Sequence, residues 1–287
     1  MKIAITGATG RVGYPIARHL VALGHHVMTL GRRPLPGIAH LPWDLTGGPP
    51  ELTGTDALVH AAFAHIPNRY RGGEGDDPEA FRARNLDGTL QLFAKASACG
   101  VGRIIYLSSR AVYDGYPAGS ILTESLPARP KNLYGVLKAE VEDWLDVAAG
   151  PGLAVASLRA TGVYGPGAPG QPHKWRDMFE SYAKGVMPRP GIGSEVHEDD
   201  VAAAIALLLT VEADRLSPAF FNVSDIVLDR RDLLTAFNDA TGNPRPLPER
   251  SDPATVSVMR CDRLRGLGWQ PRGITGLQTS VQSMTSG

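Results

Sequence analysis

The sequence begins MKIAITGATGRVG (residues 1–13), a short apolar run that passes directly into three glycines. The aliphatic stretch from Lys2 to Thr6 predicts a buried strand. After Gly13, apolar residues continue at helical spacing through Ile16 and Leu20 to a stop at Gly24. Glycines between a strand and a helix permit a tight turn, and the free N–H groups at the helix start attract a pyrophosphate. The opening stretch therefore predicts a dinucleotide-binding turn.

Apolar runs and longer stretches of helical period alternate through the next 140 residues. Further strands are expected at Val27 to Leu30, Ala57 to Ala61, Arg103 to Ser108 and Ala154 to Leu158. The clearest helix runs from Asp77 to Cys99, with Pro78 in its first turn and Gly100 as its stop. Parallel strands need crossover helices, which then cover both faces of the sheet. We therefore expect an α/β fold with a doubly wound parallel sheet of the Rossmann type.

The composition of the sequence changes after Gly162. Glycines and prolines recur from Tyr164 to Gly193 around one helix-like block, Lys174 to Gly185, whereas a helix from Asp199 to Val211 and a strand from Phe220 to Val223 return to the sheet. We expect a dinucleotide-binding domain of residues 1–163 with 196–224. Residues 164–195 with 225–287 are expected to form a small C-terminal substrate lobe.

Composition excludes several classes of partner. Lysine plus arginine and aspartate plus glutamate each total 29, so no excess of positive charge points to nucleic acid or an acidic membrane. Cys99 and Cys261 match no metal-ligand or redox spacing, and no metal site is expected. The first apolar run stops after six residues, too short for a secretory signal or a membrane span. We expect a cytoplasmic protein with a small-molecule substrate.

The second expected strand indicates which dinucleotide binds. An NAD enzyme usually carries an acidic residue about 20 residues beyond the glycines, where it holds the ribose 2′-hydroxyl. No Asp or Glu lies between Gly10 and Asp44, and Leu30 is followed by Gly31, Arg32 and Arg33. Two guanidinium groups beside a small residue suit a 2′-phosphate. The pattern favours NADP over NAD, although an arginine pair can also simply solubilise a loop.

Tyr134 and Lys138 lie four residues apart in a stretch of helical period, so both side chains face one site. A tyrosine with a pKa near ~10 is a poor base at neutral pH, and a nearby ammonium group lowers that pKa. Such a pair can exchange a proton with a carbonyl or alcohol oxygen. Ser109 follows a strand and can hydrogen-bond the same oxygen, because ligands of open α/β sheets bind at the carboxyl ends of the strands.

These residues carry a resemblance to extended short-chain dehydrogenases/reductases, the NAD(P)-dependent epimerase/dehydratase family. The similar stretches span nearly the whole chain: TGATGRVG at 6–13, HAA at 60–62, NLDGT at 85–89, YLSSRAVYDG at 106–115, YGVLK at 134–138, LRATGVYGPG at 158–167, VHEDDVAAAI at 196–205, FNVSD at 221–225 and LGWQP at 267–271. The resemblance implies a catalytic triad of Ser109, Tyr134 and Lys138, and Tyr113 selects Ser109 over Ser108. It also implies that Lys138 holds the nicotinamide ribose.

The residues expected at the dinucleotide are Gly7, Thr9, Gly10, Arg11, Val12, Gly13, Arg32, Arg33, Asp44, Leu45, Ala61, Ala62, Asn85, Lys138, Thr161 and Val163. Asp44 is expected either to contact the adenine amino group or to serve as a turn residue. Asn85 is expected either to support the lysine or a bound water, or to be a polar residue on a buried helix face. The helices at 77–99 and 134–149 resemble those that pair across a homodimer in this family, so a homodimer is one expectation.

The residues around His197 bear on the reaction. Members that act on nucleotide diphosphate sugars commonly place an arginine four residues before this histidine, where Gly193 stands here. Arg176, Arg189, Arg230 or Arg231 can substitute. No acidic pair adjoins Ser109, as a dehydratase would require. The leading hypothesis is net hydride transfer between NADP(H) and a small hydroxyl or carbonyl compound, such as a sugar, sugar acid or aldehyde.

Two alternatives stay open. The first is a nucleotide-sugar epimerase or dehydratase that uses tightly bound NAD. The second is a non-catalytic NADP-sensing regulator, since fold alone does not fix function. His197 and Asp200 can face a substrate by their spacing, but a histidine at a helix start more often packs or caps.

Overall fold

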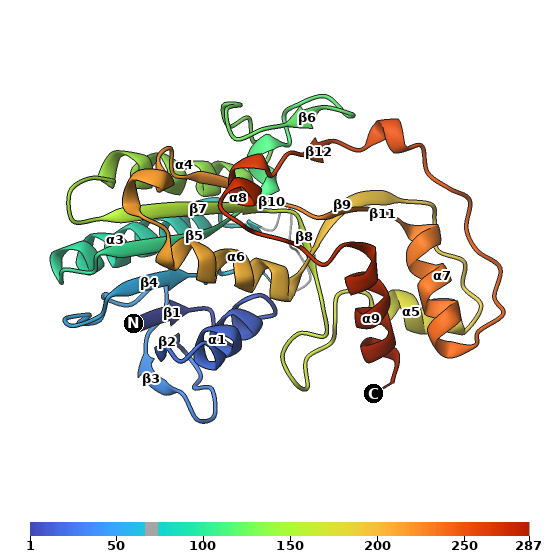
Figure 1. The fold of residues 1–287 in the computed structure, drawn as a ribbon, viewed down its shortest axis with the longest axis horizontal. Coiled ribbons are helices and arrows are strands. Elements are labelled where there is room, and N and C mark those ends of the chain that lie inside the picture. Colours follow the sequence, from blue (N-terminus) through green and yellow to red (C-terminus); the bar gives the residue numbers. More distant parts are fainter. Residues whose placement is uncertain (67–73, 287) are drawn as a thin grey trace.

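The computed structural model describes residues 1–66 and 74–286. Seven strands form one sheet in the order β10-β7-β5-β4-β1-β2-β3, and every pair of neighbours runs parallel (Figure 1). They are β1 (Lys2–Thr6), β2 (His26–Gly31), β3 (Ala39–Pro42), β4 (Ala57–His60), β5 (Arg103–Ser109), β7 (Ala154–Ala160) and β10 (Phe220–Val223). The expected doubly wound α/β fold is confirmed. The sequence pattern missed β3, a four-residue edge strand that contains His40 and ends at Pro42.

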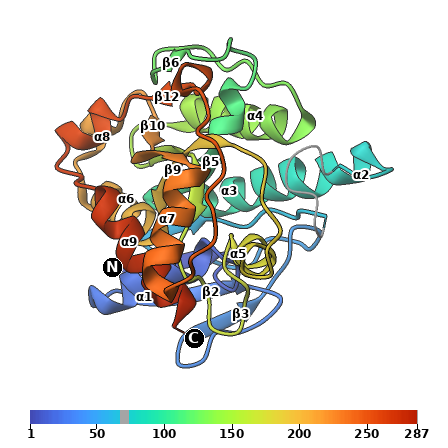
Figure 2. The same ribbon diagram turned by 90° about the vertical axis from the view of Figure 1, so that its right-hand side faces the viewer.

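Two layers of helices sandwich this sheet (Figures 1 and 2). α1 (Gly13–Ala22) and α6 (Glu198–Thr210) cover one face, where Ile16, Leu20 and Ile205 join the strand residues in one apolar cluster. α3 (Gly88–Ala98) and α4 (Leu133–Ala148) cover the other face with a second cluster. Burial on both faces explains why the strands read as continuous apolar runs rather than alternating ones.

The stretch expected as one helix from Asp77 to Cys99 is interrupted. Asp77 caps α2 (Pro78–Arg82) by accepting the Ala80 N–H, and a π-helical turn (Ala83–Asp87) then leads into α3. An added Cβ at Gly88 would lie 2.0 Å from the carbonyl oxygen of Leu45, so the helix passes very close to the chain that follows β3. The expected helical stretch is thus confirmed in extent, from Pro78 to Ala98, but it contains a π-helical turn that holds Asn85.

A second group of elements lies to the right in Figure 1, and a short strand pair lies at the top of that view. A three-stranded sheet comprises β8 (Gly162–Tyr164), β9 (Ile192–His197) and β11 (Ile226–Asp229). It meets α5 (Arg176–Ala183), α7 (Arg230–Thr241) and α9 (Gly273–Thr285), which share a third apolar cluster. β6 (Ile121–Leu122) pairs with β12 (Val258–Met259), and α8 (Asp262–Gly266) follows. The sequence pattern missed these short strands.

β1 lies at the point where the strand order of the large sheet reverses. The chain leaves β1 toward β2 and β3 on one side, and later strands add on the other side beginning with β4. Ligands of open α/β sheets bind outside the carboxyl ends of the strands at such a switch point. The turn after β1 and the turn after β4 are therefore adjacent at the place where a dinucleotide is expected. In the described ranges, no helix is both long and apolar enough to cross a membrane.

Candidate active site

The glycine turn between β1 and α1 has no room for a side chain at Gly7 or Gly13. A Cβ on Gly7, whose φ is +71°, would lie 2.7 Å from the backbone of Ala61 and Ala62, and one on Gly13 would lie 2.1 Å from the Gly7 carbonyl oxygen. The Gly10 N–H donates to the same carbonyl at 2.8 Å. No side chain caps the start of α1 at Val12 in the described chain, which leaves helix N–H groups for an anion. The turn thus fits the pyrophosphate of a dinucleotide.

A buried histidine orients the turn after β4. His60 lies between Thr6 and Thr89, with ring nitrogens 2.9 Å and 3.1 Å from their hydroxyl oxygens. Thr89 donates its own hydrogen to the Asn85 carbonyl, so Nε2 of His60 is the nitrogen that donates to Thr89. Nδ1 then accepts from Thr6, whose oxygen in turn accepts the Ala62 N–H at 3.1 Å.

The charge of His60 follows from its environment. Burial, reinforced by the positive charge of Lys138, lowers the pKa of His60 to about 3, so the ring is neutral throughout the physiological range. A neutral ring can donate from one nitrogen and accept at the other, as this chain of bonds needs. In the sequence His60 stands out only as part of the stretch HAA at 60–62, and nothing local in the chain predicts its positioning role.

The residues expected to select the dinucleotide lie at the carboxyl end of β2. Arg32 and Arg33 are exposed, and nothing lies within 4 Å of a Cβ built on Gly31. Asp44 is also exposed, and its Oδ1 accepts from the backbone and hydroxyl of Thr46, which hold the pKa of Asp44 below its ordinary value. Asp44 thus acts as a turn residue, and Leu45 beside it is buried in the core.

The expected catalytic pair, Tyr134 and Lys138, lies in the first turns of α4. Asn132 caps this helix by accepting the Gly135 N–H at 2.9 Å. A Cβ on Gly135 would lie 2.7 Å from the carbonyl oxygen of Ala111, in the short 3₁₀ turn (Arg110–Tyr113) that follows β5. Glycine at this position therefore brings Tyr134 close to the chain that carries Ser109.

Lys138 is buried beneath this turn with its ammonium group aimed at the end of β5. Nζ donates to the Leu107 carbonyl at 2.7 Å and lies 5.8 Å from the centroid of the Tyr134 ring. The faces of Phe63 and Tyr106 also flank it, at 4.7 Å and 4.6 Å. Burial lowers the pKa of Lys138 to about 7, and the Glu142 carboxylate opposes this shift. The ammonium has two further N–H groups for a tyrosine oxygen or a ribose.

Ser109 ends β5 and caps the 3₁₀ turn. Its Oγ accepts the Ala111 N–H at 3.2 Å, so the hydroxyl hydrogen can be donated to a substrate oxygen. The neighbouring Ser108 is buried, and its Oγ has no hydrogen-bond partner in the described part of the chain. The structure thus gathers Ser109, Tyr134 and Lys138 at the carboxyl end of β5.

Four further residues expected at the cofactor lie in apolar or hydrogen-bonded surroundings. Val12, Ala61 and Val163 pack at the margin of the apolar cluster beneath the glycine turn. Thr161, after β7, is turned toward β10 and bonds to Val223 and Ser224.

The Asn85 side chain bonds to backbone groups and not to Lys138. This side chain accepts the Ala64 N–H at 2.6 Å and donates to the Phe81 carbonyl at 3.0 Å. Asn85 is fully enclosed, which matches the alternative of a polar residue on a buried helix face. Because it fixes Ala64, it positions the chain beside Phe63, whose ring contacts Lys138.

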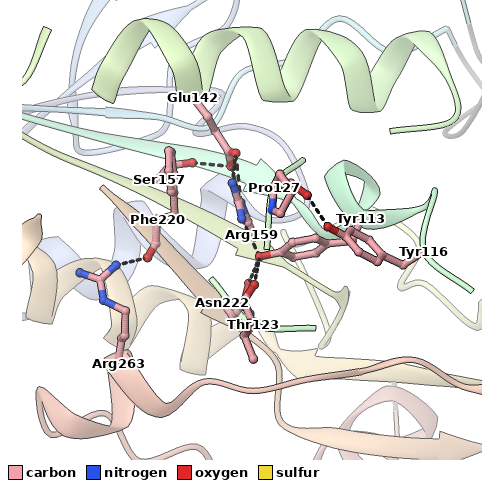
Figure 3. Close-up of polar contacts among 10 residues, drawn as sticks. All are labelled: Tyr113, Tyr116, Thr123, Pro127, Glu142, Ser157, Arg159, Phe220, Asn222 and Arg263. Carbon is pink, nitrogen blue, oxygen red and sulfur yellow. Dashed lines mark hydrogen bonds and ion pairs between the residues drawn. The ribbon is translucent and has the colours of Figure 1, made fainter. Parts of the chain in front are cut away.

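A buried ion pair joins α4 to the large sheet, and no local pattern in the sequence predicts it (Figure 3). Nη2 of Arg159 on β7 lies 2.6 Å from Oε2 of Glu142 on α4, and both side chains are nearly inaccessible. Arg159 also donates to the Tyr113 hydroxyl at 2.5 Å, and that hydroxyl donates to Asn222 on β10 at 3.1 Å. This network ties α4 to the sheet one turn beyond Lys138.

A cavity of about 210 Å³ lies between the small sheet and α5 and α7. Trp175, Met178 and Leu228 give it apolar walls, and Glu195 and Arg230 supply charge. Glu195 forms an ion pair with Lys174 on the side facing Gly162.

His197 caps α6, where its Nδ1 accepts the Asp199 N–H at 3.1 Å. Burial lowers the pKa of His197 to about 4, so the ring is neutral. Asp200 accepts the Arg272 N–H at 3.1 Å. Both residues therefore serve packing and capping, in keeping with the commoner role of a histidine at a helix start.

Comparison with known proteins identifies the family. A family model described as the NAD dependent epimerase/dehydratase family matches residues 3–224. The chain belongs to this family. It is 28% identical to a dTDP-6-deoxy-L-talose 4-dehydrogenase (NAD(P)(+)) of Kitasatospora kifunensis over 94% of this chain and 91% of that protein. It is also 27% identical to a UDP-glucose 4-epimerase of Corynebacterium glutamicum, covering 98% and 94%.

Solved structures of the epimerase/dehydratase family share the whole fold. MoeE5 in complex with UDP-glucose and NAD has a TM-score of 0.79 and 25% identity, over 100% of this chain and 99% of that chain. The UDP-glucose 4-epimerase of Thermus thermophilus in complex with NAD has a TM-score of 0.78 and 27% identity over the same shares. The protein is thus an NAD(P)-dependent enzyme of this family, which sets aside the alternative of a non-catalytic sensor. Its relatives include dehydrogenases, reductases and epimerases. Within residues 1–66 and 74–286, no three His, Cys, Asp or Glu side chains gather as metal ligands would.

Proposed function

We propose that this enzyme catalyses net hydride transfer between NADP(H) and a small hydroxyl or carbonyl compound, such as a sugar, sugar acid or aldehyde. The observation that carries the proposal is the approach of the buried Lys138 ammonium to Tyr134, beside the strand end that holds Ser109. These groups exchange a proton at an oxygen atom, as the interconversion of an alcohol and a carbonyl requires.

Each of the three residues has a distinct role in this proposal. Bound nicotinamide supplies or accepts the hydride. Tyr134 donates or removes the proton on the substrate oxygen, and the charge of Lys138 lowers the pKa of that tyrosine. Ser109 donates a hydrogen bond to the same oxygen and polarises it.

The preference for NADP rests on the end of β2. Arg32 and Arg33 are exposed beside the open space at Gly31, and no acidic residue follows this strand before Asp44. The Oδ1 atom of Asp44 is already engaged by Thr46 and Gly47. Two guanidinium groups can form charge-assisted hydrogen bonds to a 2′-phosphate. NAD stays the alternative cofactor, because the solved relatives named above contain NAD.

The preference for a small substrate rests on the cavity beside β9. Gly193 supplies no charge there, and Arg230 is the candidate arginine that lines the cavity. Arg176 instead pairs with Glu180, and Arg231 donates to the Pro248 carbonyl. The negative charge of Glu195 is offset by its ion pair with Lys174, which leaves Arg230, among the described residues, as the cation beside this cavity.

Parallel titrations with NADPH and NADH, followed by nicotinamide fluorescence, test the choice of cofactor. We expect tighter binding of NADPH, and about 10- to 100-fold weaker NADPH binding in Arg32→Ser/Arg33→Ser, because bonds to charged groups are lost. NADH binding should barely change. Arg18→Ser is the control, since Arg18 is an exposed arginine in the middle of α1. Equal losses for both dinucleotides would contradict the arginine argument.

A nucleotide-sugar epimerase is the second candidate. The observation in its favour is the likeness to UDP-glucose 4-epimerases in sequence and in fold. An epimerase returns the hydride to its substrate and consumes no cofactor. Release of NAD from the purified protein on denaturation, together with interconversion of UDP-glucose and UDP-galactose, would favour this candidate over the reductase.

Two structural expectations accompany these proposals. The division into residues 1–163 with 196–224 and residues 164–195 with 225–287 stays a prediction, as does the homodimer. α3 and α4, the helices expected to pair across that dimer, lie side by side on one outer face of the sheet. Sedimentation velocity of the purified protein gives its oligomeric state.

A further inference from the structure

A loop from β8 to α5 touches the glycine turn, although the two are about 160 residues apart in sequence. Nε2 of Gln171 donates to the Thr9 carbonyl at 2.8 Å. The Arg11 guanidinium donates to the Pro172 carbonyl at 3.3 Å. Residues 165–173, here called the strap, therefore bond to the turn that is expected to hold the pyrophosphate.

A buried carboxylate holds the other end of the strap. Glu198 is the first residue of α6 and only 4% exposed, and both of its carboxylate oxygens accept the Gly167 N–H at 3.0 Å. A Cβ on Gly165, whose φ is +151°, would lie 2.2 Å from Cδ of Glu198, so glycine is needed for the strap to pass.

Burial and neighbouring charges, one of them on the glycine turn, set the pKa of Glu198. Burial raises the pKa of Glu198 to about 7; the Gly167 N–H opposes this shift, and Asp199 adds to it. Arg11 of the glycine turn and Arg272 before α9 also stabilise its negative charge. Glu198 is thus a buried acid whose compensating partners come from the strap and from the turn beneath it.

We propose that Glu198 is a positioning residue that holds the strap closed on the glycine turn, and that this closure sets the rate at which bound dinucleotide leaves. Thr9 and Arg11 belong to the turn expected at the pyrophosphate and are the residues that the strap contacts. A dinucleotide seated on that turn leaves when these contacts separate. This role holds for NADP and NAD alike, because it concerns the pyrophosphate end of the binding site.

The test is a stopped-flow displacement experiment on the full chain. Protein loaded with NADPH, and separately with NADH, is mixed with an excess of the oxidised dinucleotide while nicotinamide fluorescence is followed. Glu198→Val should release the dinucleotide about tenfold faster, since the acceptor of the Gly167 N–H is lost. Gln171→Ala, at an exposed position, should also speed release. Association should not be slower in either variant, because a strap that opens more readily also admits the dinucleotide.

Two controls separate this role from a general loss of structure. Glu198→Gln keeps an oxygen that accepts the Gly167 N–H and should restore slow release, whereas Asp177→Asn, an exposed acid on α5, should change nothing. Hydrogen exchange of strap peptides in ligand-free protein should be faster in Glu198→Val and like wild type in Glu198→Gln. Unchanged release in both Glu198→Val and Gln171→Ala would overturn the proposal, as would fast release in Glu198→Gln.

Discussion

Nζ of Lys138 lies 5.8 Å from the centroid of the Tyr134 ring, one helical turn away on the same face of α4. Nζ is fixed there by a hydrogen bond to Leu107 on β5. Both residues of the proposed proton-transfer pair thus lie on α4, whereas the Lys138 ammonium is held in place by β5.

Tyr134→Phe should lower kcat by about 10²- to 10⁴-fold, because the group that exchanges the proton is removed. Dinucleotide binding and thermal stability should stay near wild type. Steady-state kinetics on an identified substrate measures the effect. Tyr116→Phe is the matched control, since the Tyr116 hydroxyl donates to the exposed Pro127 carbonyl rather than to a residue of the proposed site. Unchanged turnover in Tyr134→Phe would sink the proposed role.

Lys138 should make stability depend on pH. Its folded-state pKa of about 7 lies below the ordinary value of 10.5, so between these values the unfolded chain binds the proton more readily. Wild type should therefore lose stability as pH falls from about 10 to about 7, and this contribution should then level off. As pH falls through that window, the free energy of unfolding of Lys138→Met should rise relative to that of wild type by about 1.4 kcal/mol per pH unit.

Urea unfolding of wild type and Lys138→Met at pH 6, 7, 8 and 9 measures this difference. Loss of the hydrogen bond to Leu107 changes the difference in unfolding free energy by a similar amount at every pH, so it does not alter how that difference depends on pH. A difference independent of pH between 7 and 9 would show that Lys138 keeps an ordinary pKa in the ligand-free protein.

The ion pair of Glu142 and Arg159 should matter far more than an exposed one. Glu142→Gln leaves the buried Arg159 without a counter-charge and should lower the free energy of unfolding by about 3–5 kcal/mol. The same substitution at Glu140, whose partner Arg82 is about half exposed, should cost less than about 1 kcal/mol. Urea unfolding compares the two variants, and similar losses would contradict the structural role of the buried pair.

Gly13→Ala should weaken binding of NADPH and NADH by about tenfold or more. Its Cβ would lie 2.1 Å from the Gly7 carbonyl oxygen, so the turn must move away from the geometry that suits a pyrophosphate. Gly266→Ala is the control, because nothing lies within 4 Å of a Cβ there. In α8 it should stabilise the protein by up to about 1 kcal/mol. Wild-type affinity in Gly13→Ala would mean that the turn does not contact the dinucleotide.

Local patterns predicted much of the molecule. The glycine turn, the parallel sheet and the pairing of Tyr134 with Lys138 all depend on residues close together in sequence, or on the repeated alternation of strand and helix. β8 and β9 were missed because glycine, polar or charged residues interrupt their apolar residues. β11 was missed because its apolar run, Ile226 to Leu228, is only three residues long. The π-helical turn at Asn85 was missed because helical spacing of apolar residues does not report one extra residue in a turn.

The sequence by itself determined the family, the type of sheet and the residue types available for proton transfer. Only the tertiary structure decided which long-range contacts position those residues. Leu107 fixes Lys138, His60 orients the turn after β4, and Glu198 holds the strap. The physical reason is that a buried polar group must find its hydrogen-bond partner wherever the fold supplies one, and these partners lie up to 56 residues away in sequence.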